Sequence, residues 1–447
     1  MTSILRTTVR QYRESPLAQN TGWMLFGQSL CLFIQAAYFV IIARSLGPKE
    51  YGAFIAVAAA TQLLCPFVGL GAGSVLIKHV ARDRKAFPQY WCNLISMTAV
   101  SGVVASAVLI TLIRLFLPQS IPLLVIVLIS LADLLFSKFT EGATQAFQAI
   151  ERLDVVAQLK IISALVRLVG IATLSVLVHR CLAVHWSAVY LLTTIIGATI
   201  GTVWVRLSIG KGSSRVDRSK LELRQGLYFA TGLASYNINN DIDKVMLARL
   251  TTLGAVAIYA AAYRFVAISF TPVSSLLAAT YPGFFRNGAL GVAGSYKYAK
   301  RYLPATVLCG GVATAALFVG APYVPYFLGP DFQDTCTALR WLALLPLFKS
   351  IQVLFADALT GAGYQGIRTG LQFGIAIFNV LVNLWAIPRY SWRGAAWSSL
   401  LCDGTLMAGM WILCRAIQER DGRLARNQVA SGDLLSRSLS AKSMINL

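Results

Sequence analysis

Several basic residues of this 447-residue sequence lie inside long apolar stretches, where a charge is costly. The embedded cations that we single out are Lys160, Arg167, Arg264 and Lys349. If the stretches are membrane helices, each charge costs on the order of 3 kcal/mol at a helix centre unless water or a partner compensates it. Lys160 precedes Arg167 by about two helical turns and therefore shares its helix face. Such cations predict a cavity for an anionic group, such as phosphate or pyrophosphate.

Acidic residues in the same stretches allow two interpretations. The acidic residues are Asp133, Asp241, Asp243, Asp357 and Asp403, and we consider Lys244 together with the two acids that precede it. The carboxylates would either titrate as an ion-coupling site or act as counter-ions for the embedded cations, and we favour the counter-ion interpretation. Asp241 and Lys244 are spaced to pair along one helix face, which would make their helix easier to insert. Lys160 also has a purely structural interpretation, because its long side chain can extend to the lipid headgroups.

The elements that must position these residues are twelve apolar stretches, each long enough to cross about 30 Å of hydrocarbon as a helix. The predicted spans are 22–42, 52–75, 93–117, 120–137, 156–178, 185–205, 226–250, 254–279, 302–328, 338–360, 366–387 and 394–415. The composition, 57% hydrophobic and 13% charged, is too apolar for a soluble protein. The sequence therefore predicts an all-α integral membrane protein with about 12 transmembrane helices.

The formal net charge of +21 indicates membrane topology rather than nucleic-acid binding. Most of the 39 Lys and Arg residues lie near the two termini and in every second connection, which predicts cytoplasmic N- and C-termini. Residues 1–20 are basic and polar and predict no cleavable signal peptide. The predicted parts are a cytoplasmic segment 1–21, a six-helix bundle 22–205, a basic cytoplasmic linker 206–225, a second six-helix bundle 226–415 and a disordered cytoplasmic tail 416–447.

A weak internal repeat suggests how the predicted bundles are related. Residues 43–53 and 248–262 share Ala-Arg, Leu-Gly and a Tyr followed by Ala at similar spacing. Because an even number of spans separates the two copies, the halves have the same orientation and are related by a pseudo-twofold axis along the membrane normal. Close helix packing is expected at the Gly-x-x-x-Gly pairs 69/73, 197/201 and 370/374.

Other chemistries lack the residues that they need. No Cys-x-x-Cys pair occurs, and no two of the three histidines are four residues apart, so we expect no metal site. The phosphate-binding pattern Gly-x-x-x-x-Gly-Lys-Ser/Thr is missing too, so we expect neither bound ATP nor another cofactor. The driving force would then be an ion gradient, the membrane potential or the flux of substrate.

Parts of the sequence resemble a known family. Residues 41–52 (IIARSLGPKEYG) with Gly69-Leu70-Gly71, residues 148–152 (QAIER), and residues 243–247 (DKVML) leading to 258–264 (IYAAAYR) resemble the Wzx-type polysaccharide flippases. These belong to the multidrug/oligosaccharidyl-lipid/polysaccharide exporter superfamily. The resemblance covers most of the first eight predicted spans, and the last four match only in helix pattern.

The resemblance implies a flippase of the bacterial inner membrane that works by alternating access through a cationic central cavity. Its substrate would be an oligosaccharide linked to undecaprenyl pyrophosphate. Its partners would be membrane lipids and two further components of the pathway, a polysaccharide polymerase and the chain-length machinery. Arg44 and Glu50 fall on the first-loop motif of the family, and Asp243 and Arg264 on its pattern in spans seven and eight. The chain departs from the family at Cys65-Pro66, which argues against a straight second span.

Two other functions are compatible with such a sequence. A multidrug exporter of the same superfamily would need an acidic cavity for cationic drugs, whereas the deep charges here are mainly positive. An intramembrane polymerase or glycosyltransferase would normally need a long outside loop or a carboxylate pair on one, and the outside connections here are short. We therefore expect a transporter and not an enzyme.

Overall fold

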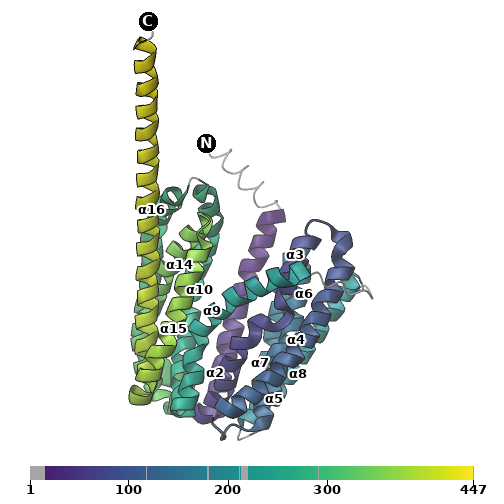
Figure 1. The fold of residues 1–447 in the computed structure, drawn as a ribbon. Helices are drawn as coiled ribbons and strands as arrows, with labels where there is room; N and C mark the ends of the chain where they lie inside the picture. Colours follow the sequence, from purple (N-terminus) through teal and green to yellow (C-terminus); the bar gives the residue numbers. More distant parts are fainter. Residues whose placement is uncertain are drawn as a thin grey trace, which may run out of the picture. The chain divides into compact units, whose positions relative to one another are not determined.

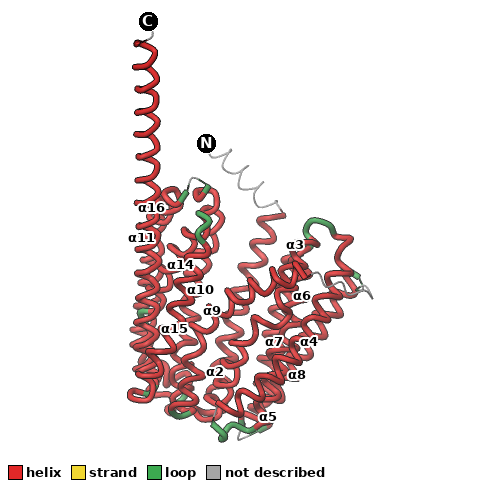
Figure 2. The backbone as a smooth tube through the Cα atoms, in the orientation of Figure 1, coloured by secondary structure: helices red, strands yellow, loops and turns green. Residues whose placement is uncertain are grey.

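The computed structural model describes residues 16–116, 118–178, 181–210, 212, 220–289 and 291–445. These residues form helices joined by short turns, and no strand occurs among them (Figure 2). They belong to two compact units, which are described separately. The first unit comprises Met1–Ala262, Pro322–Ala338 and Val380–Ala395, and the second comprises Tyr263–Ala321, Leu339–Asn379 and Ala396–Leu447. The predicted all-α class is confirmed.

The described helices also confirm a multi-pass membrane protein. Nine of them are long and apolar enough to span a membrane, or ten if one bent pair counts as a single span. Gly27–Val80 contains most of the first predicted span and all of the second, and the bent pair, Pro330–Leu342 with Leu345–Gly361, covers the tenth. The helix at the seventh predicted span, α9 (Lys220–Leu250), is not among them. The count of twelve spans stays a prediction.

The first unit is built mainly from the N-terminal half of the chain (Figure 1). Its elements are α2 (Pro16–Leu64), η1 (Cys65–Gly71), α3 (Ala72–Val80), η2 (Arg84–Ala86), α4 (Phe87–Phe116), α5 (Leu123–Leu131), η3 (Ala132–Phe136), α6 (Ser137–Ala149), α7 (Leu153–Leu177), α8 (Ala183–Ser208) and α9. Helix α2 packs along α7 and α9, and α8 packs on α6 and α7. Buried apolar residues of α3, α4, α6, α7 and α8 form one core, which includes Leu76, Leu94, Phe147 and Val205.

Two interruptions shape the first two predicted spans. Gly47 has φ 68° and ψ 174° inside α2, and Pro48 follows it, so two helices meet there at a kink. Glycine adopts this left-handed φ without the steric cost that a Cβ would add. A second break is η1, where the backbone leaves helical geometry at Val68, Gly69 and Leu70. The expectation that Cys65-Pro66 disturbs the second span is therefore correct.

A π-helical turn interrupts the fourth predicted span. Residues Ala132–Phe136 form this turn, and the helix continues as α6 to Ala149. The fourth span was predicted to end at residue 137, but the helix continues for about three more turns. The extension is amphipathic, with Gly142, Ala143, Ala146 and Phe147 buried on one side. Residues 138–149 are more polar than the predicted span, but their buried side stabilises the helix beyond residue 137.

The second unit contains most of the C-terminal half. Its elements are most of α10 (Leu253–Gly288), α11 (Val292–Gly320), the end of α13 (Gln333–Leu342), α14 (Leu345–Gly361), the first part of α15 (Gln365–Tyr390) and most of α16 (Trp392–Ile445). Its core joins residues of α10, α14 and α16, including Val273, Phe284, Phe355, Leu359 and Met410. The intervening η4 (Ala321–Tyr323), α12 (Val324–Leu328) and η5 (Pro330–Phe332) belong to the first unit, apart from Ala321.

Close helix packing occurs at some of the predicted glycine pairs. A Cβ on Gly73 would lie 1.7 Å from Oε1 of Gln145, and a Cβ on Gly201 would lie 3.0 Å from Cβ of Ala143. At Gly370 and Gly374, by contrast, a Cβ would meet no atom within 4 Å. The third glycine pair therefore does not mark a packed interface within the described residues.

Two boundaries differ from those predicted. The compact units divide after residue 262, so α9 lies with the first unit and not with the C-terminal half. One reason is a direct contact, because Nδ2 of Asn237 donates to the carbonyl of Gln62 at 2.8 Å. Helix α16 runs on to Ile445, so residues 416–445 are helical where we expected disorder. That segment is rich in Arg, Leu and Ala, which favour helix.

Candidate functional site

A buried polar cluster surrounds Asp133 in the first unit. The π-helical turn presents the Asp133 carboxyl, which is 5% exposed. The hydroxyl of Tyr190 on α8 donates to its Oδ1 at 2.6 Å, and Oγ1 of Thr61 on α2 lies 2.7 Å from its Oδ2. Both oxygens of the buried carboxyl are therefore hydrogen-bonded, as burial of a polar group requires.

Arg167 on α7 belongs to the same cluster. Its guanidinium lies 4.9 Å from the centroid of the Tyr190 ring, in cation–π geometry. Asp133 and Tyr38 are close enough to interact with it electrostatically. The arrangement is that of a cation and its counter-ion joined through Tyr190, which is the role that we favoured for Asp133.

Lys138 and Glu141 on α6 are polar residues of this region that the sequence analysis missed. Nζ of Lys138 lies 2.7 Å from Oε2 of Glu141, and the lysine side chain is 13% exposed. It also interacts with the thiol of Cys65 and with Asp133. A π turn has more residues per turn than an α-helix, so it brings positions five apart, such as 133 and 138, toward one face. The amphipathic pattern of residues 137–149 was the signal that could have revealed them.

Lys160 and Arg167 share a helix face but not an environment. Lys160 is exposed and lies near Cys31 of α2, whereas Arg167 is half-buried beside Tyr190. The structure therefore does not bring Lys160 into the cluster around Asp133. Its exposed position agrees with the simpler interpretation, in which the lysine extends to the headgroups.

The first-loop motif makes two helix caps. The Nη2 group of Arg44 donates to the carbonyl of Tyr326 at 2.7 Å, in the last turn of α12. Oε2 of Glu50 accepts from the backbone N–H of Ala183, the first residue of α8, at 2.9 Å. A cation at a helix C-terminus and an anion at an N-terminus are both favourable. Arg44 is thus engaged in capping and is not gathered with the other predicted cavity cations.

A separate polar cluster lies on α9. Nζ of Lys244 lies 2.5 Å from Oδ1 of Asp241 and 2.9 Å from the carbonyl of Asn240. The neighbouring Asp243 is 1% exposed, accepts from the backbone N–H of Lys244 at 2.8 Å and accepts from the hydroxyl of Tyr259. Asp241 and Lys244 therefore form the pair that their spacing predicted.

In the second unit, Lys349 on α14 lies beside the ring and hydroxyl of Tyr263 and near the carboxyl of Asp403. Its Nζ lies 2.5 Å from the hydroxyl of Tyr263 on α10 and 4.9 Å from the centroid of that ring. Oδ2 of Asp403 on α16 lies 3.8 Å away, beyond direct hydrogen-bond distance. The lysine side chain is 17% exposed and Asp403 6%. Lys349 is thus a largely buried cation whose carboxylate neighbour, Asp403, lies too far away for a direct hydrogen bond. Arg264, the residue after Tyr263, is half-buried.

About two helical turns after Lys349, α14 contributes Asp357 to a cavity of about 380 Å³. The ion pair of Asp357 and Arg368 lines this cavity. Asp357 lies 3.3 Å from Nη1 of Arg368, which also donates to Oγ1 of Thr360 at 2.8 Å. The cavity lies among α10, α14 and α15, and its other lining residues are Phe270, Ser274, Leu277, Ala278, Tyr281 and Val353. Lys349, Val353 and Asp357 recur at intervals of four residues and share one face of α14. The partner of Asp357 is Arg368, which lies at the start of the predicted span 366–387 and was not singled out in the sequence analysis.

Most embedded acids therefore lie beside a cation: Asp133 near Arg167, Asp241 beside Lys244, Asp357 beside Arg368 and Asp403 near Lys349. Within the described residues, no group of three or more His, Cys, Asp or Glu side chains is placed to hold a metal ion. The described polar interior consists of paired charges held by tyrosine and threonine hydroxyls.

Comparisons with solved structures define the class of fold. The chain is similar to an inward-facing multidrug resistance MATE family transporter of the MOP superfamily, with a TM-score of 0.73, 14% identity, and coverage of 89% of this chain and 99% of that one. For the inward closed lipid II flippase MurJ, the TM-score is 0.70, the identity 12% and the coverage 89% and 87%. For a MOP superfamily transporter from Pyrococcus furiosus, the values are 0.64, 15%, 92% and 98%. The chain has the fold of this transporter superfamily.

The family follows from the sequence match. Residues 17–287 match the family described as Polysaccharide biosynthesis protein, and the chain belongs to this family. A comparison with curated proteins gave no match. The resemblance noted on the motifs of the first eight predicted spans is confirmed at the level of the family.

Proposed function

We propose that this protein translocates an oligosaccharide linked to undecaprenyl pyrophosphate from the inner to the outer leaflet of a bacterial plasma membrane. Membership of a polysaccharide biosynthesis family, together with a MOP superfamily fold, supports a flippase or exporter. The observation that carries the substrate class is Lys349, a deep cation whose acidic neighbour stands at 3.8 Å. An incoming phosphate group can replace that loose contact with charge-assisted hydrogen bonds.

The face that includes Lys349 suits both parts of such a substrate. Lys349 lies on the same face of α14 as Asp357. Asp357 lines the cavity together with Arg368 of α15 and with Phe270 and Tyr281 of α10. Aromatic side chains offer flat apolar surfaces with polar edges, which suit sugar rings. The lysine would take the pyrophosphate and the aromatic cavity the sugars.

The membrane potential would supply the direction. No ATP-binding motif was found in the sequence. Moving a head group of charge −2 outward, across a potential of about 100 mV that is negative inside, releases roughly 5 kcal/mol at about 2.3 kcal/mol per charge. Alternating access of two helix bundles would carry the head group, with both termini in the cytoplasm. The protein would transport without catalysis and would supply a polysaccharide polymerase and its chain-length machinery.

Complementation tests this proposal directly. A bacterium depleted of its own flippase is given the parent chain, Lys349→Ala, Lys349→Arg or the control Arg389→Ala, at matched membrane levels. Arg389 is an exposed arginine stacked on Trp385 in the first unit. We expect surface glycan with the parent and the control, at least a tenfold loss with Lys349→Ala, and partial retention with Lys349→Arg, because a buried charge-assisted contact contributes about 1.5–3 kcal/mol. Equal glycan from parent and Lys349→Ala would overturn the assigned site.

A further inference from the structure

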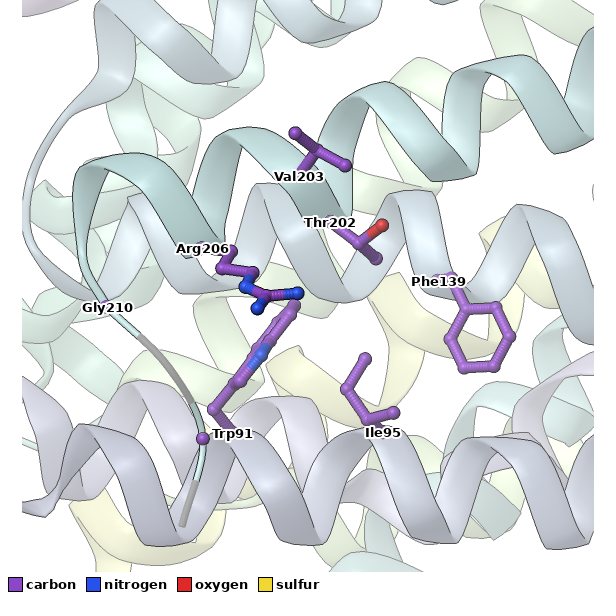
Figure 3. A pocket seen from close by; sticks show the side chains of 8 residues that line it. Trp91, Ile95, Phe139, Thr202, Val203, Arg206 and Gly210 are labelled. Atoms are coloured by element: carbon purple, nitrogen blue, oxygen red, sulfur yellow. The ribbon is translucent and has the colours of Figure 1, made fainter.

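A second cavity lies in the first unit, and its lining residues belong to none of the clusters described above. Its volume is about 510 Å³, and it is lined by residues of α4, α6 and α8 and by Gly210 and Gly212 (Figure 3). Trp91 stands near the start of α4 and Arg206 in the last turn of α8, so the cavity lies where these helices end. Such ends fall at the boundary between hydrocarbon and headgroups when a helix spans the membrane.

The lining of this cavity is amphipathic. Ile95, Phe139 and Val203 form apolar walls, while Thr202 and Arg206 bring a hydroxyl and a guanidinium. Figure 3 shows Arg206 and Trp91 pointing into the same space. Arg206 is exposed, and none of the ion pairs among the described residues involves it. An exposed guanidinium that lines a cavity can contact an external anion.

Two of the helices that line the cavity, α4 and α8, also carry exposed apolar side chains. Val103 and Val104 on α4 are 55% and 56% exposed, and Leu192 and Leu207 on α8 are 58% and 80% exposed. Apolar side chains exposed along two membrane-spanning helices face the hydrocarbon of the bilayer. A molecule in the cavity can therefore place an apolar chain along these helices while its polar end meets Arg206.

We infer that this cavity binds an anionic glycerophospholipid of the surrounding membrane, with the lipid phosphate at Arg206 and one acyl chain against Phe139 and Val203. Tryptophan at the interface and a basic side chain beside it are typical of such contacts. The site is distinct from the face of Lys349, and it does not depend on the transported substrate.

Native mass spectrometry of the full-length chain tests this inference. The purified protein is equilibrated with phosphatidylglycerol or with phosphatidylcholine of the same acyl chains, and retained lipid is counted for the parent, Arg206→Gln and Arg206→Lys. The control is Arg114→Gln, which removes an exposed arginine from the opposite end of α4. Monodispersity and thermal unfolding establish that each variant is folded.

We expect Arg206→Gln to retain phosphatidylglycerol roughly tenfold more weakly than the parent, equivalent to about 1.4 kcal/mol. Arg206→Lys should retain most of the binding, and Arg114→Gln all of it. Two results would overturn the inference: equal retention by parent and Arg206→Gln, or equal losses of phosphatidylglycerol and phosphatidylcholine. Displacement of the lipid by millimolar inorganic phosphate would also count against it, because a free anion would then be sufficient.

Discussion

At the scale of single residues, the hydroxyl groups around the buried charges determine how those charges are held. Asp133 accepts from Tyr190, and Lys349 meets the hydroxyl of Tyr263. Each tyrosine lies against a cation as well, so it joins a hydrogen bond to a cation–π contact. A tyrosine is suited to both tasks because its ring attracts cations and its hydroxyl is polar.

Removing one such hydroxyl should weaken the first unit measurably. We expect Tyr190→Phe to lower the free energy of unfolding by about 2 kcal/mol, because a hydrogen bond to a charged group contributes roughly 1.5–3 kcal/mol. Thermal unfolding in detergent measures the change, and Tyr323→Phe, at a residue that is 62% exposed, is the control. Equal stability of the two variants would show that the Tyr190 hydroxyl does not hold Asp133.

The types of these residues could be predicted from the sequence, but their partners could not. Depth within an apolar stretch identified Arg167, Lys349, Asp133 and Asp403 as costly charges. Thr61 and Tyr190 are separated from Asp133 by 72 and 57 positions, so only the packing of α2 and α8 brings them to it. The helix-end contact of Arg44 could not be predicted, because a charge beside a helix end looks the same in sequence whether it caps a helix or binds a ligand.

At the scale of elements, the interruptions of the helices are as informative as the helices. Apolar length predicted the position of most spans, since hydrocarbon thickness sets it. Helix α9, at the seventh predicted span, is not among the described helices that are long and apolar enough to cross a membrane. The π turn at Ala132–Phe136 and the amphipathic α6 escaped prediction, because one extra residue in a turn leaves no pattern of hydrophobicity. The break at η1 was predictable, since Pro66 and two nearby glycines mark it.

The kink in α2 provides a test that isolates backbone geometry. We expect Gly47→Ala to cost about 1–2 kcal/mol of stability, because an L-residue pays this at a left-handed φ. Gly311→Ala is a matched control, since a Cβ at either position would meet no atom within 4 Å and Gly311 lies inside α11 without a positive φ. We expect this control to gain up to about 1 kcal/mol from its higher helix propensity. If both variants change the free energy of unfolding by the same amount, the positive φ at Gly47 is not the reason why glycine occupies this position.

At the scale of the whole molecule, the sequence predicted the class, the superfamily fold and the family. Composition and hydropathy were sufficient for the class, because lipid admits few backbone arrangements. The division into compact units was predicted less well. Helix α9 carries its own buried charges and contacts α2, and neither feature is visible as a boundary in composition.

Transport of a charged head group should respond to the membrane potential. In vesicles of uniform protein orientation that contain the lipid-linked substrate, a potassium diffusion potential of either sign is imposed. We expect the leaflet opposite the cytoplasmic face to gain substrate when the cytoplasmic side is negative and to lose it when the sign is reversed, by at least about tenfold between the two, since two charges correspond to roughly 5 kcal/mol per 100 mV. An identical distribution under both signs would mean that no net charge crosses.

The caps at Arg44 and Glu50 have a mechanical consequence, because they stand three residues before and three residues after Gly47. One arm of the kinked helix is fastened to the end of α12 and the other to the start of α8. A glycine at a bend would ordinarily behave as a loose joint. Here the helix on each side of Gly47 is held by its own hydrogen bond, so the kink angle is restrained from both sides. A change of this angle requires one of the two hydrogen bonds to break, or α12 or α8 to move together with the helix that it contacts.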